Sequence, residues 1–423
     1  MPESLNNPEE LATHLAKQAR KASRAIATAS ETTKNNVLQR LADLIRQRSQ
    51  AILDANALDL AHAKDLSLSS ALIDRLRLTS ERIEAMALGV ENVASLQDPV
   101  GRIEDPQQRP NGLEIARMRI PLGVICIIYE SRPNVTIDAG ALCLKSGNTP
   151  ILKGGKEAHH SNGVLVSLMR EALEQEGLDP NVIQAIATSD RSVIAQLIRQ
   201  NKYVDLVIPR GGEGLIRYIT ENATVPVIQH YKGVCHVYVD SKANLEMAAE
   251  IAFNAKVQRP GVCNAMETLL VHRDIARDLV PMLFPRYEEA GVELRVDSRL
   301  RSLFPSALAA TEVDWDTEFL DLTLAVRMID SPEQAIEHID TYGSGHTESI
   351  VTDDYDLAER FIREVSSSCV IHNASTRFND GGELGLGAEI GISTSKLHAY
   401  GPMGLEELTT RKFVVHGKGQ IRR

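Results

Sequence analysis

The sequence predicts an α/β fold of two doubly wound units in series, each a parallel sheet with helices on both faces. From Gly123 onward, short β-rich runs alternate with helical stretches, a pattern typical of parallel sheets covered by helices. The rhythm changes near Gly233, which indicates that one sheet ends there and another begins. A chain of 423 residues with 43% hydrophobic residues is long enough for two such cores.

Helices are expected throughout the first hundred residues. Leu38, Leu41 and Ile45 recur at helical spacing behind a helix-start signal at Ser30. Residues 102–120 differ, because alternating apolar residues flank a turn rich in proline, asparagine and glycine. This stretch predicts an edge hairpin, and a ribbon without a core of its own usually needs a partner surface.

After the hairpin, short apolar runs predict strands and longer amphipathic stretches predict helices. The expected strands are residues 123–129, 150–153, 204–209, 225–229, 235–239, 267–271, 324–329, 349–351 and 369–372. The expected helices lie near residues 135–145, 158–176, 190–200, 242–256 and 273–289.

Composition excludes several classes of protein. A formal net charge of -11 without a Lys/Arg run argues against nucleic-acid binding. Five cysteines at wide spacings without a CxxC pair predict a reducing compartment, with neither a disulfide framework nor a zinc site. The histidines show no ligand spacing, so we expect no metal. We also expect a cytoplasmic protein without a membrane segment, because no signal sequence or long apolar run is present.

One cysteine is placed to react. In Gln-Arg-Pro-Gly-Val-Cys-Asn, Cys263 follows a Pro-Gly bend that can direct its thiol into a cleft. The alternative is a buried packing cysteine, the usual fate of a cytosolic thiol. The polar neighbours Gln258, Arg259 and Asn264 favour the reactive interpretation.

Polar clusters follow three of the expected strands, at residues 129–134, 153–156 and 210–213. In open α/β sheets, ligands occupy the crevice beyond the carboxyl ends of the strands. Glycines at such ends allow phosphates to approach backbone N–H groups, although each cluster alone is also compatible with a plain turn.

These residues resemble the gamma-glutamyl phosphate reductases, a family of the aldehyde dehydrogenase superfamily. The resemblance extends from about residue 10 to the C-terminus. Its longest blocks are residues 121–136, 209–212, 258–265, 387–394 and 398–410.

The resemblance implies reduction of L-glutamyl 5-phosphate to L-glutamate 5-semialdehyde by NADPH, the second step of proline biosynthesis from glutamate. Cys263 matches the nucleophile, which forms a thioester and expels phosphate. Asn134 matches the oxyanion donor, together with the Cys263 backbone N–H. Without the resemblance, Asn134 is equally compatible with a helix N-cap.

The cofactor loop implied by the resemblance is Lys153-Gly154-Gly155-Lys156. NAD-using relatives have an acidic residue where this chain has Lys156, and a lysine there favours the 2'-phosphate of NADP(H) over NAD. The alternative for Lys156 is a solvated lysine. Further cofactor contacts are expected from the loop Arg210, Gly211 and Gly212, and from Glu318, which matches the glutamate that holds the nicotinamide ribose. The residues after Glu318 depart from the usual Gly-Pro.

Substrate recognition needs cations for a carboxylate and a phosphate. Arg132, Arg259 and Arg377 are the candidates, with Arg377 preferred, although each also suits a structural ion pair. Asn379 and Asp380 are candidates for the α-ammonium group.

Two rival functions remain open. Hydrolytic aldehyde dehydrogenases have Glu-Leu-Gly-Gly-Lys, whose glutamate activates water, where this chain has His230-Tyr231-Lys232-Gly233-Val234. The missing carboxylate disfavours hydrolysis, although His230 could serve as a base. The other rival is a non-catalytic binding protein, which would not need both a thiol and an oxyanion donor.

The resemblance also implies the domain organisation. We expect an NADP(H)-binding domain from residues 1–101 and 121–233, and a catalytic domain from residues 234–395. A small β oligomerisation flap would combine residues 102–120 with 405–423. The flap implies a homodimer or homotetramer. Glutamate 5-kinase, which makes the labile acyl phosphate, is a candidate partner.

Overall fold

The computed structural model describes residues 7–422 except 66, 67, 69 and 230. The chain divides into two compact units. The first extends to Gln229 and also contains Gly385–Gly391 and the residues from Met403 onward. The second contains the residues from His230 to Leu384 and Ile392–Pro402. The sequence prediction placed the first boundary at 233 and did not foresee the return of Gly385–Gly391 to the first unit.

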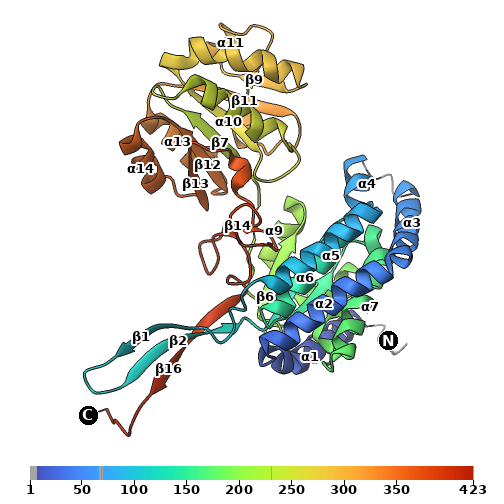
Figure 1. The fold of residues 1–423 in the computed structure, drawn as a ribbon. Helices are drawn as coiled ribbons and strands as arrows, with labels where there is room; N and C mark the ends of the chain where they lie inside the picture. Colours follow the sequence, from blue (N-terminus) through green and yellow to red (C-terminus); the bar gives the residue numbers. More distant parts are fainter. Residues whose placement is uncertain (1–6, 66–67, 69, 230, 423) are drawn as a thin grey trace. The chain divides into compact units, whose positions relative to one another are not determined.

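Capped amphipathic helices open the first unit (Figure 1). The hydroxyl of Ser30 accepts from the Thr33 N–H, and that of Thr79 accepts from the Arg82 N–H, as N-caps do. The helices are α1 (Pro8–Ala27), α2 (Glu31–Gln47), α3 (Ser49–Asp65), α4 (Ser70–Leu76) and α5 (Ser80–Ser95).

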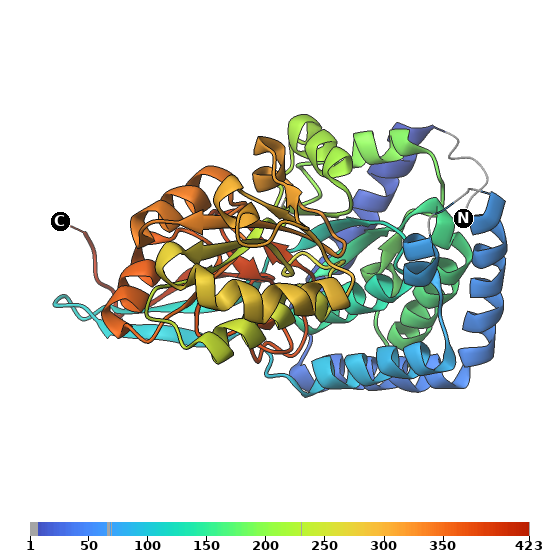
Figure 2. The same cartoon turned by 90° about the horizontal axis from the view of Figure 1, so that it is seen from above.

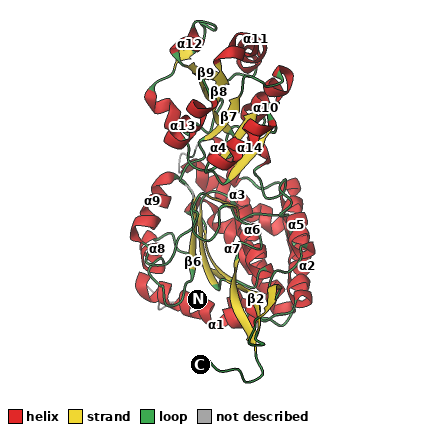
Figure 3. Cartoon of the chain, turned by 90° about the vertical axis from the view of Figure 1, so that its left-hand side faces the viewer, coloured by secondary structure: helices red, strands yellow, loops and turns green. Residues whose placement is uncertain are grey.

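A parallel sheet in the order β5-β4-β3-β6 follows in the same unit. Helices α1 and α8 pack on the face of β3 that carries Val124 and Cys126, and α6 and α7 lie on the opposite side (Figure 3). The strands are β3 (Val124–Tyr129), β4 (Thr149–Lys153), β5 (Gln184–Ala185) and β6 (Leu206–Arg210). The helices are α6 (Pro133–Lys145), α7 (His159–Gln175), α8 (Arg191–Leu197) and α9 (Glu213–Asn222), with short 3-10 turns at Lys156–Ala158 and Pro180–Val182.

The second unit contains a larger parallel sheet in the order β10-β9-β11-β8-β7-β12-β13. Helices α10 and α11 bury one face and α13 and α14 the other, as Figure 2 shows. The strands are β7 (Cys235–Val239), β8 (Met266–His272), β9 (Glu293–Val296), β10 (Leu308–Ala309), β11 (Thr323–Ile329), β12 (Thr347–Val351) and β13 (Cys369–His372). The helices are α10 (Leu245–Val257), α11 (Arg273–Glu289), α12 (Ser298–Arg301), α13 (Pro332–Tyr342) and α14 (Tyr355–Glu364), with 3-10 turns at Glu312–Asp316 and Thr376–Phe378. The antiparallel pair β14 (Ile392–Ser393) and β15 (Gly401–Pro402) completes it.

An antiparallel ribbon belongs to the first unit. Strands β1 (Ile103–Gln108), β2 (Glu114–Pro121) and β16 (Thr409–His416) lie side by side in the order β1-β2-β16 (Figure 1). The carboxylate of Glu104 accepts from Arg102 and Arg119 and joins the first two strands. The hairpin predicted at residues 102–120 is confirmed, and β16 lies within residues 405–423, which were expected to join it.

The two parallel sheets with helices on both faces are also confirmed, but some elements differ from prediction. Residues 225–229 form only an isolated bridge between Val207 and Val227. Pro226 has no N–H to donate, and its carbonyl accepts from Val207, so the run cannot continue a ladder. Strands β5, β9 and β10 are short and were not predicted. Among the described residues, no helix is long and apolar enough to cross a membrane.

Candidate active site

The nucleophile loop connects α10 to β8 in the second unit and carries Cys263. The Cys263 side chain is partly exposed. The backbone of the loop is held closely, because a Cβ at Gly233 would overlap the Cys263 carbonyl, which also accepts from the thiol of Cys235 at 3.1 Å. Asn264 fixes the next position, since its Nδ2 donates to the carbonyl of Asn379 at 2.9 Å. The loop therefore presents one thiol on a braced backbone.

The other four cysteines are poor candidates for a nucleophile. Burial raises the pKa of Cys126 to about 12 and also raises the pKa of Cys143, Cys235 and Cys369. A raised thiol pKa suppresses the thiolate, which is the reactive form. This leaves Cys263 as the thiol best suited to attack an acyl carbon.

Predicted substrate residues gather around this loop. The Nε of Arg377 donates to Oε1 of Gln258 at 2.8 Å. Burial, then the charge of Arg259, lower the pKa of Arg377, whereas Asp380 and Cys263 raise it. The structure thus brings Cys263, Arg259, Arg377 and Asp380 of the second unit into one electrostatic neighbourhood.

Asn379, the other residue predicted for the α-ammonium group, has its side chain engaged inside the second unit. Its side chain is completely buried, and its Nδ2 donates to Oγ1 of Thr347 at 2.7 Å. Its backbone carbonyl holds Asn264. We therefore assign Asn379 to bracing the loop and not to contact with substrate. The carboxylate of Asp380 accepts from the Gly382 N–H at 2.9 Å and stays partly exposed.

Glu318 lies in an irregular turn before β11 and is partly buried. Two residues later, Leu320 has a φ of 54°, in the left-handed region that a branched side chain rarely adopts. The N–H of Leu320 donates to Oε1 of Glu267 at 3.2 Å. The turn that carries Glu318 is thus held from β8.

Asn134 and Arg132 lie at the start of α6 in the first unit. Arg132 occupies the N-cap position without a side-chain cap, and Asn134 is inside the first turn. Asn134 is therefore not the N-cap, and its Nδ2 donates to Oδ2 of Asp138 at 3.0 Å. Burial raises the pKa of Asp138 to about 6, although Asn134 and Arg210 oppose the shift.

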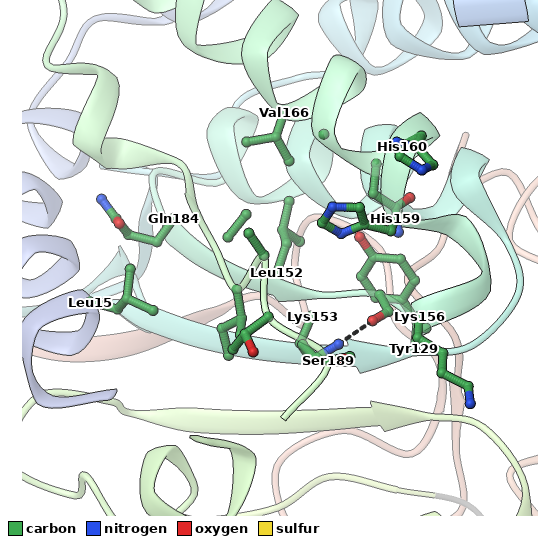
Figure 4. A pocket seen from close by; sticks show the side chains of 18 of the residues that line it. Leu15, Tyr129, Leu152, Lys153, Lys156, His159, His160, Val166, Gln184 and Ser189 are labelled. Atoms are coloured by element: carbon green, nitrogen blue, oxygen red, sulfur yellow. Dashed lines mark hydrogen bonds between the residues drawn. The ribbon is translucent and has the colours of Figure 1, made fainter. Parts of the chain in front are cut away.

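A cavity of about 790 Å³ in the first unit lies beside the end of β4 (Figure 4). Lys153, Gly154, Gly155 and Lys156 all line it. The Nζ of Lys153 donates to the carbonyl of Gly154 at 2.6 Å (Figure 4), and burial lowers the pKa of this lysine. A Cβ at Gly154 would overlap Asn162, so the tight approach of the loop to α7 requires glycine.

The cavity combines apolar and polar walls. Leu152 and Val166 are on its lining together with His159 and His160 (Figure 4). An apolar wall suits an aromatic base, and cationic or hydrogen-bonding groups suit phosphate and ribose. The residues present therefore fit a nucleotide.

Arg210, Gly211 and Gly212 are not among the described residues that line this cavity. The N–H of Gly212 donates to Oε2 of Glu130 at 3.1 Å, at the start of α9. The Glu130 carboxylate therefore already accepts from the backbone N–H to which we expected a phosphate to bind. Arg210 packs against Gly391, where a Cβ would overlap its guanidinium. His230 lies outside the described residues.

Sequence reasoning assigned no role to four acidic groups that hold predicted site segments. They share a common feature, since each carboxylate accepts from a backbone or amide N–H of a predicted site segment: Glu130, Asp138, Glu157 and Glu267. Asp138 was detectable, because residues four apart on a helix face one another. The other three act over long sequence separations that no local pattern reveals.

The chain has relatives of known family. Residues 6–301 match the model of the aldehyde dehydrogenase family. A gamma-glutamyl phosphate reductase from Idiomarina loihiensis is 54% identical over 414 residues, which cover 98% of this chain and 99% of that protein. The crystal structure of a gamma-glutamyl phosphate reductase from Thermotoga maritima has a TM-score of 0.95 at 45% identity and covers 97% of this chain and 100% of that one.

A more distant structure shares the fold alone. An acetylating aldehyde dehydrogenase from Geobacillus thermoglucosidasius is 16% identical, with a TM-score of 0.70 and 98% of both chains covered. The chain belongs to the aldehyde dehydrogenase family and, within it, to the gamma-glutamyl phosphate reductases. The fold class and the family expected from the sequence are confirmed.

Proposed function

We propose that this protein reduces L-glutamyl 5-phosphate to L-glutamate 5-semialdehyde with NADPH and releases phosphate, as the second step of proline biosynthesis from glutamate. The observation that carries the proposal is the 54% identity to a gamma-glutamyl phosphate reductase over nearly the full length of both chains. The partly exposed Cys263 on its braced loop supplies the chemical group that this reaction needs.

In this proposal, the thiolate of Cys263 attacks the acyl carbon, the bond from that carbon to the phosphate oxygen breaks, and a thioester remains. The thiol first loses its proton to solvent, and phosphate leaves with the electron pair of the broken bond, so its departure needs no strong general base. When bound, NADPH would supply the hydride that reduces the thioester carbon. The carbon–sulfur bond then breaks, and Cys263 returns as a thiolate while the aldehyde departs.

Negative charge collects on the acyl oxygen during attack and again during reduction. We assign Asn134 and the Cys263 backbone N–H to this oxygen, because preorganised N–H donors stabilise such charge. The bond from Asn134 to Asp138 supports this role, since it uses one proton of the amide and fixes the direction of the other.

Arginines recognise the anionic ends of the substrate in this proposal. Arg377 is the principal candidate, because its Nε is held by Gln258 and its planar fork suits an oxygen pair. Arg259 and Arg132 are the further candidates, and Asp380 would face the α-ammonium. The proximity of Arg259 and Asp380 to Arg377 supports a zwitterionic substrate end at this loop.

We assign NADP(H) as the cofactor. Lys153, Gly154, Gly155 and Lys156 would hold its adenosine end in the 790 Å³ cavity, with the exposed Lys156 near the 2'-phosphate. Glu318 would hold the nicotinamide ribose. The loop of Arg210, Gly211 and Gly212 is proposed as an outer contact, because Glu130 already accepts the Gly212 N–H.

Hydrolysis of the thioester is the alternative reaction. The segment that carries a glutamate in hydrolytic relatives has Tyr231, Lys232 and Gly233 here, and the Nζ of Lys232 is bound to Asp316 at 3.1 Å. Gly233 has no side chain, and a Cβ at this position would overlap the Cys263 carbonyl in the nucleophile loop. These described residues supply no carboxylate to activate water, which favours the reductase. His230, which lies outside the described residues, stays the candidate base of the alternative reaction.

The forward reaction tests the proposal. Glutamate, ATP and a glutamate 5-kinase generate the acyl phosphate in place, and oxidation of NADPH is followed with and without the kinase. We expect oxidation only when kinase and ATP are both present. Oxidation that does not depend on the kinase would contradict the proposed substrate.

We further propose that the first unit binds the cofactor, that the second carries out catalysis, and that the ribbon of β1, β2 and β16 joins copies of the chain into a homodimer or homotetramer. Phe413 and Val415 support the last point, because they are 67% and 52% exposed on one face of β16. Loss of mass in light scattering is expected for Phe413→Asp. The setting we propose is the cytoplasm.

A further inference from the structure

A completely buried ion pair connects α10 to β8 in the second unit. The Nζ of Lys256 donates to Oε2 of Glu267 at 2.6 Å, and both side chains have no exposed surface. The proposed reaction uses neither group. Replacement of a buried ion pair by well-packed apolar residues is often neutral or stabilising, so stability alone does not explain this pair.

The two carboxylate oxygens of Glu267 accept from different donors. Oε1 accepts from the Leu320 N–H at 3.2 Å, while Oε2 is taken by Lys256. Leu320 has a φ of 54°, a conformation that persists only where the surroundings hold it. Glu318 is two residues away, and its charge contributes to raising the pKa of Glu267. The buried carboxylate therefore holds the turn that carries Glu318.

Residues on both sides of Glu318 are also held. Arg295 binds Asp314 at 2.6 Å, and Lys232 binds Asp316 at 3.1 Å. The guanidinium of Arg295 lies 5.2 Å from the ring centroid of Phe319. The segment is thus anchored before Glu318 by the buried Asp314 and the exposed Asp316, and after it by Phe319 and a bond to a buried carboxylate.

We propose that Glu267 is a positioning residue for the cofactor: one oxygen anchors the Glu318 turn through the Leu320 N–H, and Lys256 fixes the other oxygen. This inference rests on the role proposed for Glu318. Preset geometry at Glu318 lowers the entropy lost when the nicotinamide ribose binds, and therefore raises affinity.

Lys256 also explains why the Glu267 carboxylate is a strong hydrogen-bond acceptor. Burial raises the pKa of Glu267 to about 7, and Lys256 opposes that rise. An ionised carboxylate accepts a stronger hydrogen bond than a neutral acid does. Lys256 is two residues before Gln258, which holds Arg377, so the pair ties the Glu318 turn to the end of α10, which leads into the nucleophile loop.

Two double variants separate positioning from packing. Lys256→Met/Glu267→Met replaces the pair by apolar side chains and removes the acceptor for Leu320. Lys256→Met/Glu267→Gln is also neutral but keeps an amide oxygen as acceptor. Lys256→Met/Glu267→Leu is measured alongside the first variant, so that misfolding of one apolar pair does not decide the result.

The readout is the dissociation constant of NADPH, measured without turnover. The chain has a single tryptophan, Trp315, in the same segment as Glu318, and energy transfer from it reports the bound cofactor. We expect the apolar pairs to raise the dissociation constant about tenfold and the glutamine variant to stay within about threefold of wild type. The rate of Cys263 alkylation should not change.

Several outcomes would overturn the inference. Unchanged NADPH affinity in folded apolar variants would mean that the Leu320 bond does not matter. Equal weakening in the apolar and glutamine variants, with a shared drop in melting temperature, would mean that the pair is only structural. Glu318→Ala is the reference: if it leaves NADPH affinity unchanged, the proposed role of Glu318 fails and the inference with it. If Glu318→Ala weakens binding and the apolar pairs do not, the inference alone fails.

Discussion

The side-chain amide of Asn134 donates to Oδ2 of Asp138 at 3.0 Å, one turn further along α6. The bond fixes the rotation of the amide about its own side chain. A second N–H of the same amide then has a defined direction, which is what an oxyanion donor requires. The pair lies at the start of a helix that follows the central strand β3 of its sheet.

Replacement of Asn134 by alanine is expected to lower kcat/KM about 10²- to 10³-fold, the usual loss for one oxyanion donor. The affinity for NADPH should stay unchanged, because the amide is assigned to the acyl oxygen alone. Steady-state kinetics and cofactor titration check both parts. A loss smaller than about threefold would remove Asn134 from the site.

Asp138 gives the stability of the protein a dependence on pH. Burial raises its folded-state pKa to about 6 from the usual 3.8, so the protonated form is favoured in the folded protein. The contribution to stability is fully present below about pH 3.8 and is lost as the pH rises through about 6.

Asp138→Asn should therefore gain stability relative to wild type between pH 4 and pH 7, by about 1–2 kcal/mol after allowance for partial exposure. Urea unfolding at both pH values measures the difference. A gap between the two proteins that is independent of pH, or that widens in favour of wild type, would be inconsistent with the buried carboxyl.

Lys156→Glu should reverse the charge that favours a 2'-phosphate. We expect the ratio of kcat/KM for NADPH to that for NADH to fall at least about tenfold. Lys202→Glu makes the same charge change on an exposed lysine of the same unit that does not line the cavity, and is the matched control. An unchanged ratio in the Lys156 variant would show that another group selects the cofactor.

Arg377→Lys keeps the charge but removes the planar fork. We expect KM for the amino-acid substrate to rise about tenfold, with little change in KM for the cofactor, because a lysine cannot bind an oxygen pair in the same way. Arg363→Lys, on the exposed side of α14, is the control. Similar kinetics for the two variants would assign Arg377 to structure.

Much of the fold was predictable because its signals are local. The buried run Val124–Tyr129 and the amphipathic stretch Arg273–Glu289 have the periodicities of a strand and a helix, and both were found where expected. The short strand Leu308–Ala309 has no such signal, since its pairing with β9 alone makes it a strand. Residues 225–229 show the converse. Their apolar pattern predicted a strand, but Pro226 lacks the backbone N–H that a continuous ladder needs.

The sequence suggests residue types for the site but not the contacts that hold them. Cys263, Lys153 and Arg377 were identified from motifs that are contiguous in sequence. The bond of Glu267 to Leu320 joins residues 53 positions apart, and the buried Asn379 supports a loop from within. Local sequence patterns do not reveal such long-range partners. The carboxylates that hold the site were therefore identified only in the structure.

The most direct test is the reaction run backwards, with formation of NADPH from L-glutamate 5-semialdehyde, NADP and inorganic phosphate followed in wild type and in Cys263→Ala. We predict activity that requires phosphate and is abolished in the variant, because phosphate must release the acyl group from Cys263. Activity that is indifferent to phosphate, or that survives in Cys263→Ala, would contradict an acyl-phosphate reductase with this nucleophile.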